Sequence, residues 1–361
     1  MEPLSIYFHW PYCKSKCPYC DFFSKVAKSV NQAEMIESYI NELDYYHELL
    51  PKKTIRSIFF GGGTPSLIEP QHIEKLIVHA SKLWRFEDGV EISLEANPNS
   101  NHENMFKDLK NAGINRLSLG VQALNRDDLK LLGRTHNLND ALACIEDVVQ
   151  TFDNHSIDLI YARPNQNMDQ WLKELEQAVS FGLKHLSLYQ LTIEEGTLFE
   201  KRGVKAMAED KAAEMYLQTV YFLATHGYPR YEVSNFAPAQ YESKHNKCYW
   251  QGDDYIGIGE SAHGRLKLKN KHYALVYPHI KEELTPNERA EELIIMGLRL
   301  QKGIDKTHFK DITGLDFNEF INRPKLEQMV AGNLLQESNE TLCATNQGFL
   351  LLDKIILELC S

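Results

Sequence analysis

The sequence predicts an α/β fold, an incomplete parallel (β/α)6 barrel followed by a small winged-helix-like domain. Three observations predict it. Strand-like and helix-like segments alternate six times over the first half of the chain, residues suited to chemistry follow the strands, and the composition changes beyond about residue 280. A doubly wound sheet is the alternative that the alternation by itself leaves open.

Six short runs rich in β-branched and aromatic residues have the composition of strands. They lie near residues 4–8, 55–60, 90–95, 115–119, 156–161 and 185–191. Segments with helical spacing of apolar residues lie between them, at residues 33–50, 70–84, 102–112, 139–152 and 169–181. Repeated strand–helix units imply right-handed crossovers and a parallel sheet. Six units without a seventh and an eighth predict a barrel that does not close.

Residue types that carry chemistry follow most of the predicted strands. A cysteine-rich loop follows the first strand and Gly61-Gly-Gly-Thr-Pro65 the second. Glu95-Ala-Asn-Pro98 closes the third, and Gly120-Val-Gln122 follows the fourth. Asp158 lies within the fifth strand, and Tyr189-Gln190 lies near the end of the sixth. The glycines could form only a tight turn, but bare backbone can also approach a ligand closely. Because the carboxyl ends of parallel barrel strands meet on one face, we expect one pocket there.

Three cysteines, Cys13, Cys17 and Cys20, occupy the loop after the first strand with C-x3-C-x2-C spacing. Three thiolates suit three irons of a [4Fe–4S] cluster and leave the fourth iron open to a small molecule. A structural zinc site needs a fourth protein ligand, which His9 or a distant residue could supply. A disulfide is disfavoured because one of the three cysteines stays unpaired. The cluster is the favoured interpretation, with zinc as the alternative.

Other candidate site residues each have an ordinary structural alternative. Glu95 and Asp158 could cap the helices that follow them, or they could accept hydrogen bonds from an ammonium group or a ribose diol. Arg134 could be a surface cation, although a planar guanidinium also suits a ligand carboxylate. Tyr7 and Tyr19 flank the cysteine loop, where an aromatic ring could stack on a base or its hydroxyl could donate.

Bulk properties favour an enzyme-sized intracellular protein. The 361 residues exceed a typical single core, so one large and one small domain are expected. The N-terminal segment lacks the pattern of a secretory signal, and no run of about 18 apolar residues could span a membrane. Four further cysteines are scattered, as in a reducing compartment, which predicts a cytoplasmic location. A net charge of −11 argues against general binding to nucleic acid.

The last part of the chain has the pattern of a separate small domain. Thr285-Pro-Asn-Glu288 predicts the start of a helix that runs through Leu300. Two further helical stretches and a two-stranded wing at residues 334–352 complete a winged-helix-like domain, which is not basic enough to suggest DNA binding. The expected domains are residues 1–270 and 271–361. Residues 257–264, rich in glycine, are interpreted as a loop that closes the pocket.

Several motifs together resemble the radical S-adenosylmethionine superfamily. The C-x3-C-x2-C loop and the Gly-Gly-Gly-Thr-Pro turn carry this resemblance. Further segments narrow it to the branch that contains oxygen-independent coproporphyrinogen III oxidase and the HemW-type haem chaperones. These segments are Tyr7-Phe-His-Trp-Pro-Tyr-Cys13, Arg116-Leu-Ser-Leu-Gly-Val-Gln122, Leu132-Gly-Arg-Thr-His136, Asp158-Leu-Ile-Tyr161 and Tyr189-Gln-Leu-Thr-Ile-Glu-Glu-Gly196.

The resemblance implies that the three cysteines hold a cluster whose open iron chelates the methionyl amino and carboxylate groups of S-adenosylmethionine. One electron from the cluster would cleave this cofactor to methionine and a 5′-deoxyadenosyl radical. By matching position, the residues that would line the cofactor site are Tyr7, Tyr19, Gly62, Gly63, Thr64 and Glu95. Gln122, Arg134 and Asp158 match positions that hold a second cofactor molecule in the oxidase.

Two differences favour the chaperone side of this branch. The oxidase carries a fourth cysteine where this chain has Phe22, as the HemW-type proteins do. His245-Asn-Lys-Cys-Tyr-Trp250 resembles the H-N-x-x-Y-W motif of that family, in which the histidine is tied to haem binding. A lone His245 would ordinarily be a hydrogen-bonded core histidine, but imidazole suits haem iron and the neighbouring aromatic rings suit a flat macrocycle. One departure is Ala162, where relatives usually have glycine.

The resemblance therefore implies a haem chaperone that binds haem and transfers it, with a [4Fe–4S] cluster and S-adenosylmethionine as cofactors. The alternative is an oxygen-independent coproporphyrinogen III oxidase that decarboxylates porphyrinogen propionates, so enzymatic activity is left open. Another radical enzyme, such as a methyl transferase, ranks third. The implied partners are haem or porphyrin, an electron donor such as flavodoxin or ferredoxin, and a haem-accepting protein. Neither nucleic acid nor a membrane span is expected, while a peripheral membrane contact is left open.

Overall fold

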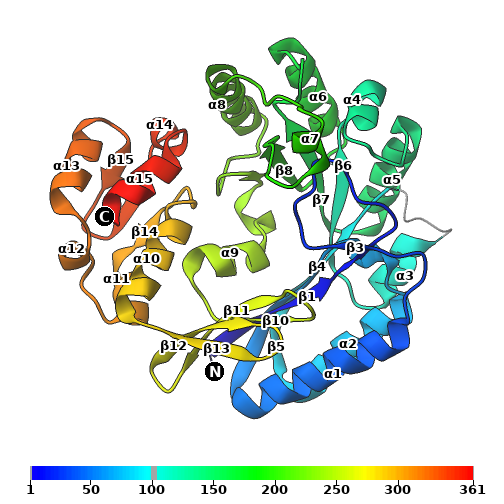
Figure 1. Cartoon of the computed structure of the whole chain (residues 1–361), viewed down its shortest axis with the longest axis horizontal. Coiled ribbons are helices and arrows are strands. Elements are labelled where there is room, and N and C mark those ends of the chain that lie inside the picture. The colour runs from blue at the N-terminus through cyan, green and yellow to red at the C-terminus, as the bar shows by residue number, and fades with distance from the viewer. Residues whose placement is uncertain (1, 99–103, 361) are drawn as a thin grey trace.

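A computed structural model describes residues 2–98 and 104–360 of the chain. Its centre is a curved sheet whose eleven strands within these residues run in the order β13-β12-β11-β10-β1-β4-β5-β6-β7-β8-β9 (Figure 1). In chain order these strands are β1 (Glu2–Trp10), β4 (Lys53–Gly62), β5 (Arg85–Ala96), β6 (Arg116–Gln122), β7 (Asn154–Tyr161), β8 (His185–Gln190), β9 (Asn235–Phe236), β10 (Tyr255–Ile258), β11 (His263–Leu268), β12 (Lys271–Val276) and β13 (Ile280–Leu284).

The strands from β10 through β1 to β8 run parallel. Six of them are the strands predicted from the sequence, so the parallel (β/α)6 unit is confirmed, and β10 adds a parallel strand beside β1. From β1 to β8 the strands lie in chain order, without the reversal that a doubly wound sheet requires. At the ends of this series β1 pairs with β10 and β8 pairs with β9, so the barrel is incomplete.

Helices that follow the parallel strands form an arc on the outer side of the sheet (Figure 1). They are α1 (Gln32–Leu49), α2 (Pro70–Leu83), α3 (Met105–Asn111), α4 (Arg126–Leu131), α5 (Leu138–Thr151), α6 (Met168–Ser180), α7 (Leu198–Lys201) and α8 (Glu209–Thr225). The five helices predicted from spacing are α1, α2, α3, α5 and α6. The first residues of the helix predicted at 102–112 lie outside the described residues.

Two of these helices begin at capping boxes that their local sequence encodes. Asn137 accepts a hydrogen bond from the backbone N–H of Asp140 at 3.1 Å, and the Asp140 carboxylate accepts from the Asn137 N–H at 3.0 Å. Asn167 and Gln170 repeat the arrangement at the start of α6, at 2.9 and 3.0 Å. Each box satisfies backbone donors that the first helical turn leaves unpaired. The starts of α5 and α6 are therefore set by residues within four consecutive positions of the sequence.

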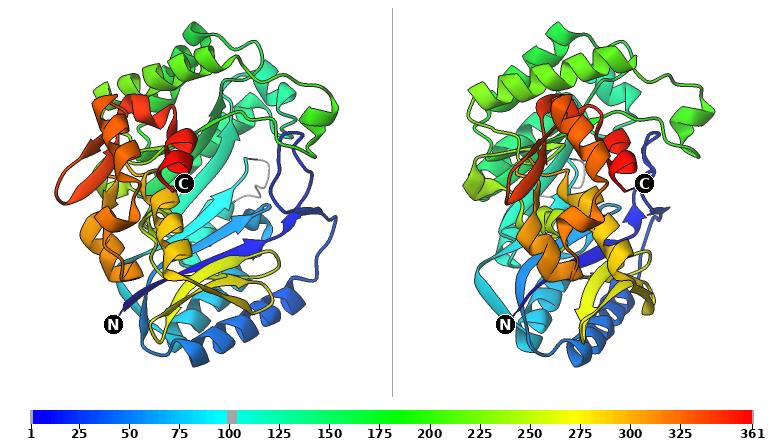
Figure 2. Two further views of the ribbon diagram at one scale, coloured as in Figure 1. Left: turned by 60° about the vertical axis from the view of Figure 1, so that its left-hand side comes forward. Right: turned by 90° about the vertical axis from the view of Figure 1, so that its left-hand side faces the viewer.

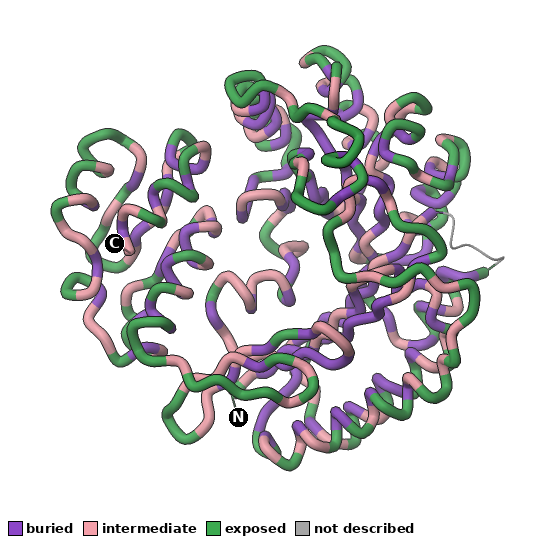
Figure 3. Tube along the Cα trace, in the orientation of Figure 1, coloured by how far each residue is buried: buried purple, intermediate pink, exposed green. Residues whose placement is uncertain are grey.

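The core is built largely from the central strands and the helix faces that cover them (Figure 3). Phe8 of β1 and Phe60 of β4 stack with ring centroids 4.8 Å apart. Parallel strands buried on both faces have near-continuous apolar runs instead of alternation. For this reason the composition of the short runs was sufficient to locate these strands.

The other edge of the sheet differs from the sequence expectation in two places. Residues 257–264 were expected to form a loop, but Gly257 lies in β10 and His263 begins β11. A Cβ on Gly257 would lie 2.2 Å from the carbonyl oxygen of His263, so the close approach of these strands requires glycine. β11, β12 and β13 continue the sheet beyond β10 (Figure 2), which places the expected boundary at 270/271 inside the β11–β12 hairpin. We propose a boundary near residue 285 instead.

The C-terminal domain starts with α10 (Pro286–Gly297), at the predicted cap between Thr285 and Glu288. Its other elements are β14 (Ile304–Asp305), α11 (Lys306–Thr313), α12 (Phe317–Phe320), α13 (Arg323–Ala331), β15 (Leu335–Glu337), β16 (Thr341–Ala344), α14 (Asn346–Phe349) and α15 (Leu352–Leu359). Helix, strand, helices and then a hairpin is the order of a winged-helix domain. The expected wing is the β15–β16 hairpin, which is shorter than predicted because α14 and α15 follow it.

A further helix, α9 (Lys244–Gln251), lies between the barrel and the C-terminal domain (Figure 1). It carries the whole of the histidine-containing motif identified in the sequence. Across the described ranges, no helix is both long and apolar enough to cross a membrane.

Candidate functional site

The predicted pocket is present at the carboxyl ends of the parallel strands, as a cavity of about 370 Å³. We call it the barrel-mouth cavity. The predicted site residues that line it are Cys13, Cys17, Tyr19, Cys20, Gly62, Gly63, Thr64, Glu95, Gln122, Arg134 and Asp158. Residues far apart in the sequence meet there because parallel strands end on the same face. Two other predicted residues, Tyr7 and His245, lie outside the cavity lining.

The cysteine loop is held at its base by a pair of short strands and by the turn after β4. β2 (Tyr12–Cys13) pairs in parallel with β3 (Lys25–Val26). Thr64 donates its hydroxyl to the Cys13 sulfur at 3.5 Å, and its backbone N–H donates to the Tyr12 carbonyl at 2.9 Å. All three cysteines of the loop are free thiols. The loop therefore presents three thiols to the cavity, with none tied up in a disulfide.

The placement of these thiols suits a polynuclear cluster better than a single ion. Within the described residues, the loop supplies three thiols to the cavity and no fourth cysteine or histidine beside them. Zinc needs four ligands at about 2.0–2.3 Å, whereas a cubane holds each thiolate on a different iron. His9, a candidate fourth zinc ligand, instead contacts the Tyr7 hydroxyl and donates to the Phe23 carbonyl, each at 3.1 Å. The donor set fits the cluster rather than the zinc alternative.

The glycine turn after β4 packs directly against the cysteine loop. Gly62 has a φ of 108°, which strains any L residue with a side chain. A Cβ on Gly63 would lie 2.7 Å from the Tyr12 carbonyl oxygen and 3.0 Å from the Cys13 sulfur. The Gly62 N–H donates to Glu95. The turn is thus required by packing, and the same bare backbone borders the cavity.

Two carboxylates, Glu95 and Asp158, line the cavity from β5 and β7. Burial, and then the nearby charge of Asp158, raises the pKa of Glu95 to about 8. Burial raises the pKa of Asp158 to about 6, although the Ser118 hydroxyl donates to it at 2.8 Å. Neither acid caps a following helix, because Asn104 occupies the N-cap position of α3 and the Asn167 side chain caps α6. A cationic ligand would favour the ionised form of both acids.

Arg134 is part of a hydrogen-bond network at the cavity and not a surface cation. Its Nη1 donates to the Cys17 sulfur and to the Tyr19 hydroxyl, both at 3.2 Å. Its Nη2 donates to the Gly120 carbonyl at 2.9 Å. The buried Nε has no hydrogen-bond partner in the described part of the chain. The guanidinium therefore braces the cysteine loop and brings a positive charge to the wall of the cavity.

Asn97 is a site residue that the sequence placed at the end of the third strand but to which it gave no role. Its side-chain oxygen accepts from Nη2 of Arg134, and its amide donates to the Thr64 hydroxyl at 3.3 Å. The available signal was its position directly after Glu95 and Ala96, at the carboxyl end of β5. Asn97 joins the β4, β5 and β6 sides of the cavity into one network.

Two non-glycine residues after neighbouring strands adopt left-handed backbone conformations. Gln122 ends β6 with a φ of 73°, and Ala162 follows β7 with a φ of 56°. Such a conformation costs roughly 1–2 kcal/mol for an L residue. Gln122 lines the cavity, and backbone strain of this kind is typical of functional sites. The φ of Ala162 explains why a glycine suits that position in relatives.

His245 is a buried residue of α9 and does not reach the barrel-mouth cavity. It is 1% exposed, and its ring nitrogens hydrogen-bond to the Ser57 hydroxyl at 2.9 Å and the Tyr249 hydroxyl at 2.7 Å. The ring stacks on Phe59 at 5.0 Å and lies 6.3 Å from the Tyr7 ring. Burial lowers the pKa of His245 to about 3, so the imidazole is neutral. Both ring nitrogens are engaged, so the expected direct contact with haem iron does not follow from its placement.

Comparison with known families agrees with this geometry. The Radical SAM superfamily profile matches residues 7–178, and the HemN C-terminal domain profile matches residues 284–351. The chain is also similar over nearly its full length to proteins named Heme chaperone HemW. It is 34% identical to the one from Haemophilus influenzae, over 99% of this chain and 97% of that protein. For the Escherichia coli protein the identity is 32%, over 99% of this chain and 98% of that protein.

A solved structure shares the whole architecture. Coproporphyrinogen III oxidase (HemN) from Escherichia coli superposes with a TM-score of 0.81, at 20% sequence identity, over 99% of this chain and 90% of that one. At this identity the likeness shows the fold alone: a partial barrel followed by the C-terminal domain.

Proposed function

The chain belongs to the HemW family of the radical S-adenosylmethionine superfamily, and on that premise we propose that it is a haem chaperone. It binds haem and passes it to a haem-requiring protein. The observation that carries the proposal is the similarity to proteins named Heme chaperone HemW over nearly the full length of both chains. We also propose a cytoplasmic location, which the seven free cysteines support because thiols persist in a reducing compartment.

The barrel-mouth cavity is the proposed site of the [4Fe–4S] cluster and of S-adenosylmethionine. Cys13, Cys17 and Cys20 would hold the cluster, which when bound supplies one electron to the cofactor. A volume of about 370 Å³ is near the lower limit of small-molecule sites, roughly 300–1,000 Å³. The cavity therefore suits one cofactor molecule beside the cluster better than two.

The chain's own residues would bind and orient that cofactor. Glu95 and Asp158 accept hydrogen bonds from its cationic or hydroxyl groups, and the positive charge of Arg134, which lines the same cavity, attracts its carboxylate. The residues that complete the wall are Tyr19, Gly62, Gly63, Thr64 and Gln122. Tyr7 does not line the cavity, so it would influence the site indirectly, through the hydrogen bond between its hydroxyl and Nδ1 of His9.

His245 would support haem binding by holding α9 in place. The Ser57 hydroxyl and the Phe59 ring of β4 both contact its imidazole, which ties α9 to the sheet. Direct ligation of iron would require at least one of the two hydrogen bonds of the ring to break. The same short helix carries Lys247 and Trp250, which are not buried in this way.

The loop around the cluster site offers a surface for an acidic electron donor such as flavodoxin or ferredoxin. Lys14 and Lys16 are exposed there, and Phe22 is 67% exposed, in a protein whose net charge is −11. Lys14→Glu should slow reduction of the cluster by reduced flavodoxin and leave reduction by dithionite unchanged, since a small reductant needs no docking surface. If reduced flavodoxin reduces the cluster of Lys14→Glu as fast as that of the wild type, this surface is not the docking site.

Anaerobic reconstitution, haem titration and a parallel coproporphyrinogen III assay test the function. We expect haem binding, delivery of haem to an apo-haem protein, and little or no decarboxylation. The expectation for the last assay rests on Phe22, which stands where the oxidase has its fourth cysteine. Robust decarboxylation without haem binding would make the oxidase the better assignment.

A further inference from the structure

Helix α9, which carries the histidine-containing motif, is too short to hold its own position. It has eight residues, Lys244–Gln251. Isolated helices shorter than about 12–15 residues are only marginally stable in water. The place of α9 in the fold therefore depends on what its two ends and its sides contact.

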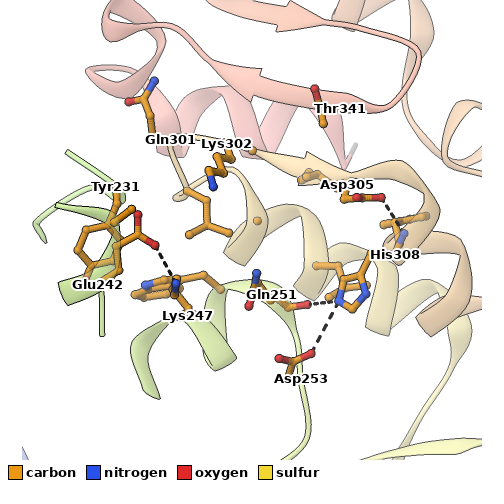
Figure 4. Close-up of a pocket in the computed structure, with 18 of the residues that line it drawn as sticks. Tyr231, Glu242, Lys247, Gln251, Asp253, Gln301, Lys302, Asp305, His308 and Thr341 are labelled. Atoms are coloured by element: carbon orange, nitrogen blue, oxygen red, sulfur yellow. Dashed lines mark hydrogen bonds and ion pairs between the residues drawn. The ribbon is translucent and has the colours of Figure 1, made fainter. Parts of the chain in front are cut away.

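One side of α9 borders a cavity of about 760 Å³ that lies between this helix and the C-terminal domain (Figure 4). We call this cavity the interdomain cleft. Lys247, Trp250 and Gln251 of α9 line it, and none of the residues that line the barrel-mouth cavity borders it. Packing on this side of α9 is therefore incomplete, which gives more weight to the contacts at the ends of the helix.

The carboxyl end of α9 is held by the C-terminal domain. The Arg289 guanidinium of α10 donates to the Gly252 carbonyl, which follows the last turn of the helix. Nε2 of His308 in α11 donates to the Gln251 carbonyl at 2.9 Å (Figure 4). This end of the helix therefore depends on where the C-terminal domain lies.

The amino end of α9 is held by a buried carboxylate of the barrel, that of Glu91 in β5. One carboxylate oxygen accepts from the His245 N–H at 3.0 Å and from the Ser243 hydroxyl at 3.3 Å. The other oxygen accepts from the Lys244 N–H at 3.1 Å. The first backbone N–H groups of a helix have no partner within it, and a negative charge at this end is favourable. Glu91 is 5% exposed, so water competes little for these bonds.

Glu91 and Ser57 are register partners on the neighbouring strands β5 and β4, and both hold His245. The Ser57 hydroxyl hydrogen-bonds to the imidazole at 2.9 Å, while Glu91 accepts from the backbone N–H of the same residue. Register partners present their side chains on the same face of a sheet. The two strands thus fix the main chain and the ring of His245 together.

A buried arginine balances the charge of Glu91. Nε of Arg116 in β6 lies 4.0 Å from the Glu91 carboxylate, and both side chains are 4% exposed. Nη1 of Arg116 donates to the Asn154 side chain at 2.6 Å and to the Tyr241 carbonyl at 3.1 Å. Tyr241 belongs to the segment that leads into α9. Because a buried charge without a partner is costly, Arg116 stabilises the carboxylate where α9 needs it.

We propose that Glu91 is a positioning residue for haem binding: it fixes the amino end of α9, and with it His245, against the barrel. This rests on the proposed haem-chaperone function. The carboxyl end of α9 is tied to the C-terminal domain, so Glu91 makes the amino end the fixed end of the motif. Glu91 does not line the barrel-mouth cavity, so its role is separate from the cluster and S-adenosylmethionine.

Glu91→Gln tests the role of the carboxylate. Glutamine keeps the shape but replaces one acceptor oxygen by an amide donor, so at least one donor of α9 loses its partner. In a titration of the full-length, cluster-loaded protein with ferric haem, the affinity should fall about tenfold, as for one lost charged hydrogen bond. The resonance Raman spectrum of the bound haem should change, while iron content and affinity for S-adenosylmethionine stay at the wild-type level. Asp88→Asn changes an exposed carboxylate on the same strand and should alter none of these.

A second control separates positioning from a general loss of stability. Asn167→Ala removes the side-chain cap of α6, so it should lower the melting temperature without changing haem affinity or the haem spectrum. If Asn167→Ala and Glu91→Gln weaken haem binding in proportion to their melting temperatures, stability alone explains the effect and the role of Glu91 is overturned.

Ser243→Ala tests the same end of α9 with the carboxylate in place. It removes the hydroxyl that donates to Glu91 and that accepts from the Asn246 N–H at 3.2 Å. Haem affinity should fall in the same direction as in Glu91→Gln. The effect of the double variant should be smaller than the sum of the two, because both substitutions release one end of one helix.

The outcomes separate this inference from the function on which it rests. A wild type that binds no haem would overturn both. A wild type that binds haem, with a folded Glu91→Gln variant of unchanged affinity and spectrum, would overturn the role of Glu91 and leave the chaperone proposal standing. If Glu91→Gln loses its cluster or does not fold, Ser243→Ala takes its place, and unchanged haem binding in that variant would overturn the role.

Discussion

The barrel-mouth cavity and the interdomain cleft differ in how their polar groups are held. In the barrel mouth, Arg134 alone bonds to Cys17 and Tyr19 of the cysteine loop, to Asn97 after β5 and to Gly120 of β6. In the cleft, Lys302 is exposed and forms no ion pair within the described ranges. Arg134 is thus fixed by four partners at the barrel mouth, whereas Lys302 at the cleft has no such fixed position.

The difference suits two roles. A reactive cluster and its cofactor need side chains held in fixed positions, which strand ends in a sheet provide. The end of α9 beside the cleft can shift with the C-terminal domain, because relative motion of domains is the default expectation across such interfaces. If the cofactor site and the haem site are independent, a change in the residues of one should leave ligand binding at the other unaffected.

The largest expected effect is loss of the cluster. Cys17→Ala should remove most of the iron and the visible absorption of the cluster, because a cubane held by two thiolates is poorly retained. Haem titration of the same variant should be unchanged if the two sites are separate. Cys343→Ala, outside the loop, is the matched control. Full iron content after Cys17→Ala would contradict the cluster assignment.

The second effect is on stability. His245→Ala should lower the free energy of unfolding by roughly 2–4 kcal/mol, because it leaves a cavity against Phe59 and deprives the Ser57 and Tyr249 hydroxyls of their hydrogen bonds to the ring. A thermal melt measures this loss, with His226→Ala as the exposed control. Haem affinity should fall through the disturbed α9, while iron content stays unchanged. A variant of wild-type stability would mean that the packing of His245 contributes little.

The third effect is confined to the barrel mouth. Arg134→Ala should weaken the binding of S-adenosylmethionine by about tenfold or more. The reason is that losing a charged interaction with the carboxylate costs about 1.5–3 kcal/mol. Equilibrium binding to the reconstituted protein measures it, and Arg202→Ala is an exposed control. Haem affinity should not change. A parallel loss of both ligands would show that the sites are coupled.

The smallest effect is a pH dependence. Below its pKa of about 8, Glu95 holds a proton that a cationic ligand must displace, so affinity for S-adenosylmethionine should rise with pH up to about 8. Asp158, with a pKa of about 6, adds a rise at lower pH. The increase is at most about tenfold per pH unit for one proton. Glu95→Gln should flatten the upper part of the curve, and a flat wild-type curve would mean that neither acid meets the cation.

The sequence by itself determined the parallel strand order, the cysteine loop and several helix starts. Strands buried on both faces have apolar runs, and a capping box such as Asn137 with Asp140 involves only neighbouring residues. The edge strands β11 to β13 escaped prediction because half-exposed strands lack such runs. The site residues at strand ends were predictable because a parallel sheet brings those ends to one face.

Only the tertiary structure decided which partners these residues meet. Arg134 reaches Cys17 across more than a hundred residues of sequence, and Asn97 joins that network through Thr64. The motif predicts an iron contact for His245, but in the fold its ring lies between the Ser57 and Tyr249 hydroxyls. Trp250 of the same motif lines a cleft that no local pattern in the sequence shows. Local periodicity fixes how a segment folds, but the direction of a side chain and its hydrogen-bond partner depend on segments far away in the chain.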